Sequence, residues 1–346
     1  MATAASAYRL PAEWEPHAAT WLAWPHRRAT WLGDFAAIPP VFETVARLLA
    51  RYEPVTIVAA GPVLAEARGR LDGVANVGFV DLPTNDAWLR DTGPVFVVPR
   101  DRSHGARPAA VCWGWNAWGG KYPPWDRDAA LGRALAGRLG IDVVDGGLVL
   151  EGGGLETDGE GTLLVNHRCL EDPARNPGVS RPRLEEILCA RLGVDRVLWV
   201  GGELAGDDTD GHIDQLARFV APGCVVAARQ PDPLDPNHAS LEATLAVLGT
   251  LVDASGRRLE VLPIDIPPRF AFEGTQLPAS HLNFYVGNGF VAVPVFGACT
   301  DEAALATLAG CFPGRSIEPV DCRDLVRGRG ALHCITRDEP SMASSR

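Results

Sequence analysis

The chain has 346 residues, of which 47% are hydrophobic and 22% are charged, a composition typical of a globular protein with a full core. Its formal net charge of -11 and its lack of any Lys- or Arg-rich run exclude the basic surface that nucleic-acid binding requires. No apolar run is long enough to span a bilayer, so we expect neither nucleic acid nor a membrane among its partners.

The first ten residues lack the basic start and the apolar centre of a secretory signal, which predicts a cytoplasmic location. The eight cysteines are scattered and form no C-x-x-C pair, so neither a zinc knuckle nor a dithiol redox centre is indicated. We expect most of them to be small buried hydrophobic residues that stay reduced. The acidic surface favours the approach of a cation, although it serves solubility equally well.

Short apolar runs rich in β-branched residues alternate with Ala- and Leu-rich segments at helical spacing along the chain. This alternation predicts an α/β protein. In chain order, the predicted elements are a helix at 42–52, a strand at 55–60, a helix at 63–71, strands at 77–82 and 95–99, a helix at 128–139, a strand at 163–166, a helix at 181–192, strands at 196–200 and 224–228, a helix at 237–253, strands at 259–263 and 290–295, a helix at 300–311 and a strand at 316–320.

A unit made of a helix and two strands recurs about five times, at 41–99, 128–166, 181–228, 237–295 and 300–336. These lengths are near those of propeller-like arrays. Because such an array brings its turns to one axis, motifs that are distant in sequence can meet there. No low-complexity tract or long linker divides the chain, which predicts a single domain.

Three segments imitate cofactor or metal motifs without meeting their requirements. Glu151-Gly152-Gly153-Gly154 lacks the glycine spacing and the helix of a dinucleotide site. The segment 158–162 lacks the Gly-Lys-Ser/Thr ending of a P-loop, and 207–210 lacks the glycine and the terminal glutamate of a calcium loop. We therefore expect no cofactor and no metal.

The cysteine nearest the C-terminus has the context of a nucleophile. Cys334 follows the glycine-rich turn 328–330 and is flanked by His333 and Thr336, which could place its sulfur at the mouth of a loop. A cysteine packed in a core strand has the same spacing. Other segments must separate the two interpretations.

Motifs upstream of this cysteine supply carboxylates and a second histidine. If their segment is extended, His212 and Asp214 point to one face, as a general acid/base and a substrate-binding carboxylate would. Trp88 and Asp91 lie in a turn-rich segment before a predicted strand. The alternatives are a core histidine with a turn aspartate, and a core tryptophan with Asp91 capping a turn or pairing with Arg90. A thiol, a histidine and spaced carboxylates suit nucleophilic attack on a cationic substrate.

Taken together, these motifs resemble the agmatine deiminase family, within the guanidine-modifying superfamily that includes the bacterial peptidylarginine deiminases. The resemblance covers about residues 8 to 340, which implies a single deiminase domain there and flexible termini at 1–7 and 341–346. It is carried by Trp88-x-Arg90-Asp91-Thr92-Gly93-Pro94, Leu150-Glu151-Gly152-Gly153 with Asp158-Gly159-x-Gly161-Thr162, Asp208-Thr209-Asp210-Gly211-His212-Ile213-Asp214 and His333-Cys334-Ile335-Thr336, and it continues through Ala12-Glu13-Trp14-Glu15-Pro16-His17, Asn116-Ala117-Trp118-Gly119-Gly120, Arg175-Asn176-Pro177 and Asn283-Phe284-Tyr285.

The resemblance implies a five-bladed pseudosymmetric α/β propeller of the pentein type, built from ββαβ repeats with its site on the central axis. It also implies hydrolysis of agmatine to N-carbamoylputrescine and ammonia, a reaction of putrescine biosynthesis and polyamine metabolism. By position, Cys334 would be the nucleophile, His212 the general acid/base, and Asp91 and Asp214 the carboxylates that hold the guanidinium.

Three further residues are expected to touch the substrate. Glu151 and Asp208 fall on acidic positions of the family pattern, and we expect Asp208 to meet the distal ammonium of a diamine-like substrate. Trp88 would form a wall against the guanidinium plane or the alkyl chain. A free cysteine has a pKa near ~8.5, so a cationic guanidinium or a charged His212 must stabilise the thiolate.

The sequence departs from the family pattern on both sides of the cysteine. Arg329 replaces one of a pair of glycines before it, and Arg337-Asp338 replaces two glutamines after it. Arg337 would either repel the cationic tail of the substrate or pair with Asp338. Asp208 stands where a longer carboxylate often sits, which leaves a slightly roomier pocket.

These departures leave the substrate open. The alternatives are deimination of another guanidine compound or of peptidylarginine, an amidinotransferase that passes the amidino group to an amine, and a non-catalytic propeller that binds guanidine metabolites. The lack of a signal peptide favours a small-molecule guanidinium substrate over a peptide. The sequence does not fix the subunit count, and a homo-oligomer is compatible with it.

Overall fold

The structure, a computed structural model, describes residues 7–101 and 107–342. The predicted flexible termini fall largely on residues 1–6 and 343–346, which lie outside the described residues. The α/β class is confirmed, because helices alternate with strands in mixed sheets. Each predicted helix and strand overlaps an observed element, and helix α8 (His238–Leu248) shows the largest difference because it ends at Leu248 instead of 253.

Within the described ranges the strands form five sheets of three or four strands and a short hairpin. The hairpin pairs β14 (Ala271–Phe272) with β15 (Thr275–Gln276). The five sheets have the strand orders β1 (Tyr8–Arg9), β5 (Val95–Pro99), β6 (Ala109–Gly114), β7 (Asp142–Val149); β8 (Leu155–Thr157), β9 (Thr162–Asn166), β10 (Arg196–Val200); β11 (Ala217–Ala221), β12 (Cys224–Arg229), β13 (Glu260–Asp265); β16 (Tyr285–Gly287), β17 (Phe290–Val295), β18 (Ser316–Asp321); and β19 (Thr336–Pro340), β2 (His17–Ala23), β3 (Val55–Ala59), β4 (Val77–Asp81).

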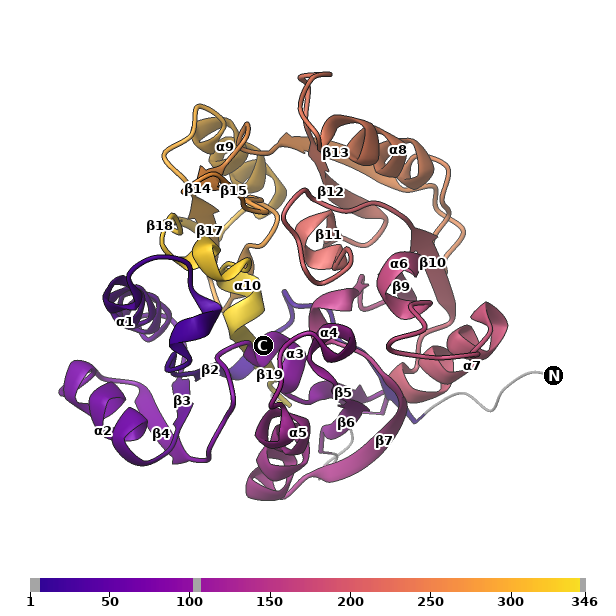
Figure 1. The fold of residues 1–346 in the computed structure, drawn as a ribbon. Helices are drawn as coiled ribbons and strands as arrows, with labels where there is room; N and C mark the ends of the chain where they lie inside the picture. Colours follow the sequence, from indigo (N-terminus) through magenta and orange to yellow (C-terminus); the bar gives the residue numbers. More distant parts are fainter. Residues whose placement is uncertain (1–6, 102–106, 343–346) are drawn as a thin grey trace.

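The five sheets share one pairing plan. Each begins with an antiparallel pair, such as β8 with β9, and continues with a parallel pair, such as β9 with β10. A parallel pair needs a crossover connection, and a helix supplies it in every sheet. The crossover helices are α1 (Ile38–Leu49), α2 (Gly61–Arg70), α5 (Asp126–Leu139), α7 (Arg181–Leu192), α8 and α9 (Asp301–Cys311), which lie at the outside of the molecule in Figure 1.

The predicted repeat boundaries are wrong, because each predicted unit begins with its helix, whereas the observed units begin with a strand. The predicted unit 41–99 joins β3 and β4 to β5, which belongs to another sheet. In the structure the chain runs strand, strand, helix, strand through four of the sheets. Two of the four first strands, β8 and β16, are only three residues long, so they give little signal in the sequence.

The fifth sheet joins the two ends of the described chain. Strand β19 pairs antiparallel with β2, and Thr336 lies opposite Leu22. The one-turn helix α10 (Leu332–Ile335) immediately precedes β19 and packs against another one-turn helix, α3 (Leu89–Thr92). Both short helices lie near the middle of the molecule in Figure 1. This pairing brings segments that are more than 200 residues apart in sequence to one place.

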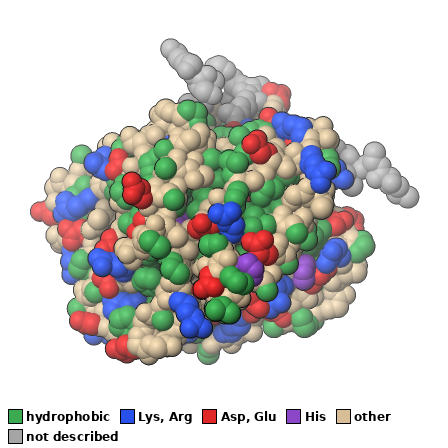
Figure 2. Space-filling model, turned by 90° about the horizontal axis from the view of Figure 1, so that it is seen from above, with side chains coloured by type: hydrophobic (Ala, Val, Ile, Leu, Met, Phe, Trp, Pro, Cys, Tyr) green, Lys and Arg blue, Asp and Glu red, His purple; other side chains and the backbone are tan. Residues whose placement is uncertain are grey.

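Apolar spacing fixes the peripheral helices against the sheets. In α1, Ile38, Phe42, Val45 and Leu49 recur at helical spacing and are fully or almost fully buried. The remaining short helices of the described chain are α4 (Ala117–Gly120) and α6 (His167–Leu170), and its 3-10 helices are η1 (Arg28–Thr30), η2 (Phe35–Ala37), η3 (Gly152–Gly154), η4 (Ile213–Gln215) and η5 (Leu325–Gly328). On the face drawn in Figure 2, acidic and basic side chains are interspersed.

Candidate active site

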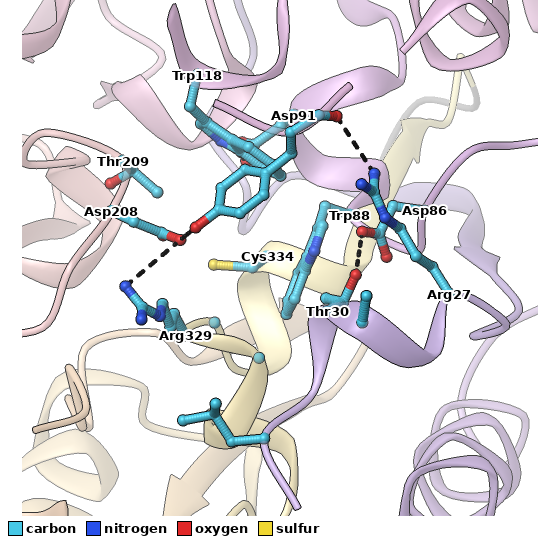
Figure 3. Close-up of a pocket in the computed structure, with 15 residues that line it drawn as sticks. Arg27, Thr30, Asp86, Trp88, Asp91, Trp118, Asp208, Thr209, Arg329 and Cys334 are labelled. Carbon is cyan, nitrogen blue, oxygen red and sulfur yellow. Dashed lines mark hydrogen bonds and ion pairs between the residues drawn. The ribbon is translucent and has the colours of Figure 1, made fainter. Parts of the chain in front are cut away.

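The sulfur of Cys334 faces a cavity of about 200 Å³ on the inner side of α10. Figure 3 shows the sulfur between Trp88, on one side, and Asp208 with Arg329 on the other. Only 4% of Cys334 is exposed, and Sγ lies 3.7 Å from Asp214 Oδ2. Burial, together with the carboxylates of Asp214 and Asp91, raises the pKa of the Cys334 thiol well above its ordinary value.

Asn283 holds the cysteine loop in place from behind. Its Oδ1 accepts the backbone N–H groups of Ala331 (3.1 Å) and Cys334 (3.2 Å). Its Nδ2 donates to Cys334 Sγ at 3.2 Å. One buried amide therefore positions the turn that carries the sulfur and offers a donor to it.

His212 lies below the cavity and is fully buried. Its Nδ1 is 3.8 Å from Asp91 Oδ1, and its Nε2 is 3.7 Å from Glu151 Oε2. Both carboxylates lie beyond ordinary hydrogen-bond distance, so neither ring nitrogen makes a short hydrogen bond among the described residues. Although burial opposes the charged form, the carboxylates of Asp91, Glu151 and Asp214 raise the pKa of His212 to about 9.

Asp91 comes from α3 and points toward the same centre. Its Oδ1 accepts the N–H of Gly153 at 2.9 Å, and its Oδ2 accepts Trp118 Nε1 at 3.1 Å. Burial raises the pKa of Asp91, and the nearby carboxylates of Asp214 and Glu151 raise it further. Such a carboxylate gains most from a cation that enters the site.

Asp214 comes from η4 and lies beside the sulfur. Its Oδ2 accepts His333 Nδ1 at 2.7 Å, while its Oδ1 has no hydrogen-bond partner among the described residues. Burial opposes ionisation, yet the imidazoles of His333 and His212 hold the pKa of Asp214 below its usual value. The unpaired oxygen is a buried acceptor without a donor, which is rare in folded proteins unless a ligand supplies one.

Gly153 marks the point on which three of these groups converge. A methyl group added at Gly153 would meet His212 Nδ1 at 2.6 Å, Asp91 Oδ1 at 2.9 Å and Asp214 Oδ2 at 3.0 Å. Only glycine allows the backbone to pass this close to them. Gly152 and Gly153, which belong to the segment that imitates a dinucleotide motif in the sequence, therefore have a packing role beside the site.

Glu151 is held by a buried arginine. Its Oε1 accepts Arg175 Nε at 2.8 Å, and its other oxygen faces His212. The side chain of Arg175 is fully buried and also pairs with Asp172 and Asp210, both at 2.8 Å. Although burial opposes ionisation, His212 and Arg175 lower the pKa of Glu151. Glu151 thus stays charged beside the imidazole.

A second row of charges lies behind the cysteine loop. His333 Nε2 is 2.9 Å from Glu13 Oε1, while its other ring nitrogen binds Asp214. Glu13 also accepts hydrogen bonds from Arg90 (2.7 Å) and Arg218 (2.8 Å). This row fixes the ring of His333 and, through it, the carboxylate of Asp214.

Aromatic rings and carboxylates form the rest of the cavity wall. Trp88 packs against Trp31 in a tilted arrangement with ring centroids 5.2 Å apart, and it lines the cavity together with Trp118 and Tyr122. At the mouth, Asp208 Oδ2 accepts the hydroxyl of Tyr122 and lies 3.8 Å from Arg329 Nη1. The wall is completed by Arg27, Ala29, Thr30, Leu32, Asp86, Asp91, Thr209, Gly328, Gly330 and Cys334.

The structure brings all seven residues singled out in the sequence to one place. Four of them line the cavity, namely Trp88, Asp91, Asp208 and Cys334, and the other three lie directly behind it, namely Glu151, His212 and Asp214. The condition that the segment 212–214 be extended is not met, because Ile213–Gln215 form a 3-10 helix. The two side chains still share the site because both approach Gly153.

The expectations for Arg337 are also wrong. Arg337 is buried, donates to the backbone oxygen of Arg90 and does not line the cavity, so it meets no substrate tail there. Asp338 pairs with Arg90 at 2.8 Å instead. The ion pair between Arg90 and Asp91, which the sequence left open as an alternative, is therefore not formed.

Sequence reasoning assigned no role to several residues of the site. Asn283, Trp118, Arg175 and His333 stand in motifs that carried the resemblance, so their positions were a usable signal. Tyr122 follows one of these motifs by two residues and gave no signal of its own. Its contact with Asp208 depends on how α4 lies against the loop 207–210.

Within residues 7–101 and 107–342, no group of three or more His, Cys, Asp or Glu side chains is arranged to hold a metal ion. Over the same residues, no helix is both long and apolar enough to cross a membrane.

Comparisons with known proteins agree on one family. The sequence model of the Porphyromonas-type peptidyl-arginine deiminases matches residues 9–340. The agmatine deiminase of Stutzerimonas stutzeri strain A1501 is 39% identical over 360 residues, which cover 96% of this chain and 96% of that protein.

Two solved structures resemble the fold closely. The agmatine deiminase of Enterococcus faecalis superposes with a TM-score of 0.91 at 31% identity and covers 97% of each chain. A cysteine-to-serine variant of agmatine deiminase from C. jejuni with substrate bound superposes with a TM-score of 0.87 at 26% identity and covers 96% of each chain.

Proposed function

The chain belongs to the Porphyromonas-type peptidyl-arginine deiminase family, and from this premise we infer that it is a hydrolase that converts agmatine and water to N-carbamoylputrescine and ammonia. The observation that carries the inference is the convergence of a thiol, an imidazole and carboxylates on one small cavity. A planar cation fits that set, because two carboxylates can accept paired N–H donors.

The chemistry assigns a role to each group around the sulfur. Asp91 and Asp214 hold the guanidinium so that its carbon faces Cys334 Sγ. Binding of the cation releases the Cys334 proton to solvent, and the resulting thiolate attacks this carbon to form a tetrahedral adduct. His212, which carries a proton below pH of about 9, then donates it to the departing ammonia. The product is an amidino group bonded to sulfur.

Water completes the reaction. His212, now neutral, removes a proton from a water molecule, which attacks the amidino carbon. The carbon–sulfur bond then breaks, the sulfur regains its electron pair and takes up the proton of the adduct's hydroxyl group, and the ureido product leaves. Glu151 and Arg175 keep the imidazole in position between the two steps. The C. jejuni agmatine deiminase, with serine in place of a cysteine and substrate bound, supports this role for sulfur.

Carboxylates at the cavity mouth support a substrate with a second cation. Asp208 and Asp86 line the wall on opposite sides of the sulfur in Figure 3. We propose that the distal ammonium of agmatine lies toward Asp208 and that its butyl chain passes along the rings of Trp88 and Trp118.

The fold and the cellular setting extend the proposal. We propose that residues 8–340 form one deiminase domain in which the five sheets are the blades of a pseudosymmetric propeller. The shared ββαβ plan and the central position of α3 and α10 support it. A cytoplasmic location and a homo-oligomer are parts of the same proposal, and they accord with a small metabolite as substrate.

The test compares three substrates. The protein is incubated with agmatine, arginine and a blocked arginine peptide, and ammonia and ureido product are measured for each, with Cys334→Ser as the control. We expect equal amounts of ammonia and ureido product from agmatine and none from the variant. Conversion of the peptide alone would make the protein a peptidylarginine deiminase. Product that forms only with an added amine would indicate an amidinotransferase, and binding without turnover would indicate a binding protein.

A further inference from the structure

Arg329 occupies an unusual backbone position in the cavity wall. It follows η5 between Gly328 and Gly330 with φ 70° and ψ 11°, a left-handed conformation that costs free energy for any residue with a side chain. Glycine would adopt it freely. The arginine therefore occupies a position whose backbone favours glycine, and contacts of its side chain must offset the cost.

The side chain of Arg329 reaches the carboxylate at the cavity mouth. Its Nη1 lies 3.8 Å from Asp208 Oδ2, and the two side chains are only 32% and 20% exposed. Figure 3 shows this pair on the side of the cavity opposite Arg27 and Asp86. Because the pair is partly shielded from water, its charges act more strongly than those of a fully exposed pair.

Within the described residues, Arg329 is the one cation within 4 Å of the Asp208 carboxylate. Lys121 contacts only the backbone oxygen of Asp208, at 2.6 Å, and pairs instead with Asp210. The hydroxyl of Tyr122 donates to the same oxygen that faces Arg329. An ammonium group that reaches Asp208 must therefore share it with a guanidinium already in place.

We propose that Arg329 tunes how tightly the cavity holds the tail of its substrate: by offsetting part of the charge of Asp208, it weakens the grip on the distal ammonium of agmatine and lets a tail that is neutral or carries a carboxylate compete. The inference rests on the proposed deiminase function, since it concerns the tail of the same substrate. A carboxylate tail would meet the guanidinium of Arg329 directly, as in other arginine–carboxylate pairs.

The test measures binding in the Cys334→Ser background, so that it does not depend on turnover. Agmatine, butylguanidine and 4-guanidinobutyrate share a four-carbon tail that ends in an ammonium, a methyl group or a carboxylate, and their Kd values are measured by titration calorimetry for Arg329, R329Q, R329G and R329K. We expect R329Q and R329G to bind agmatine roughly threefold to tenfold more tightly and butylguanidine within about twofold of the parent. They should bind 4-guanidinobutyrate more weakly, and R329K should resemble the parent.

Two controls separate the charge at this position from other effects. Arg323→Gln removes one positive charge from a surface pair with Asp321 outside the cavity and should leave all three Kd values unchanged. In a D208N background, R329Q should no longer favour agmatine. Agreement between R329Q and R329G would exclude relief of backbone strain as the cause.

The inference is overturned if R329Q binds agmatine no better than the parent, or if none of the three guanidines binds. The proposed function fails separately, if the protein with its cysteine intact binds these guanidines and releases no ammonia from any of them. Preference for 4-guanidinobutyrate in both binding and turnover would retain the role of Arg329 and replace agmatine as the substrate.

Discussion

Replacing Asn283 by aspartate would change one buried group beside the reactive sulfur while keeping its shape. Because Asn283 Oδ1 accepts two backbone N–H groups, the orientation of the amide is fixed and Nδ2 must face Cys334 Sγ, 3.2 Å away. In N283D, one carboxylate oxygen can keep the backbone bonds while the other takes the place of the donor. The hydrogen bond from Asn283 to the thiolate is thus replaced by repulsion between the thiolate and the new carboxylate.

The expected loss has two parts. A hydrogen bond to a charged group contributes about 1.5–3 kcal/mol, and this contribution disappears. Two like charges at the observed separation of 3.2 Å repel by about 5 kcal/mol at an effective dielectric constant of ~20. The new carboxylate can avoid part of this repulsion by taking up a proton, so we expect the barrier to rise by about 3–5 kcal/mol. This corresponds to a fall in kcat of roughly 10²- to 10⁴-fold.

The assay is ammonia release at saturating agmatine, with circular dichroism to establish that the variant is folded. Asn283→Ala serves as the matched control, because it removes the donor without adding a charge and should lose less activity than N283D. A folded N283D with kcat within about tenfold of the wild type would refute the view that this amide stabilises the thiolate.

Three further predictions concern the buried charges. Neutral iodoacetamide alkylates Cys334 in the free protein, and peptide mapping measures the rate. This rate should still rise with pH at pH 9, because burial holds the pKa of the thiol above the ordinary ~8.5, and a plateau below that pH would contradict this. His212→Ala should lower ammonia release by about 10²- to 10⁴-fold, and near-normal turnover would end its assignment as general acid/base. Arg175→Met should lower the free energy of unfolding in urea by about 3–5 kcal/mol, because the buried carboxylate of Glu151 loses its hydrogen-bonded guanidinium and keeps only the more distant His212, and a loss below about 1 kcal/mol would show that His212 is partner enough.

The elements that could be predicted are strands that are continuously apolar and helices with apolar residues at helical spacing. Strand β17 (Phe290–Val295) and helix α1 carry their own patterns, so their existence follows from the sequence. Strand β19, with the sequence Thr-Arg-Asp-Glu-Pro, has no such pattern. It is a strand because β2 offers it a pairing edge, and that edge exists only after the chain has folded.

The candidate site divides in the same way. Cys334, His212, Asp91 and Asp214 could be selected because their chemistry is specific and their motifs are ordered along the chain. Arg337 and Arg329 could not be distinguished, since each is an arginine a few residues from the cysteine. The structure separates them, because β19 turns Arg337 into the interior against Arg90, whereas the left-handed backbone at 329 directs its arginine to the cavity.

The charges around the sulfur explain how one site can both suppress and use a thiolate. With the cavity empty, Asp91 and Asp214 face Cys334 and favour its protonated form, so the thiol resists adventitious reaction. A guanidinium held between these carboxylates would add a positive charge at the same place, which offsets the part of the rise in the thiol pKa that Asp214 and Asp91 cause. Thermodynamic linkage makes the effect reciprocal: a thiolate strengthens binding of the cation by the same free energy by which the bound cation favours ionisation of the thiol. Ionisation and substrate binding are therefore coupled. The ureido group of the product is neutral, so its formation returns the thiol to its protonated form and weakens the hold on that end of the product.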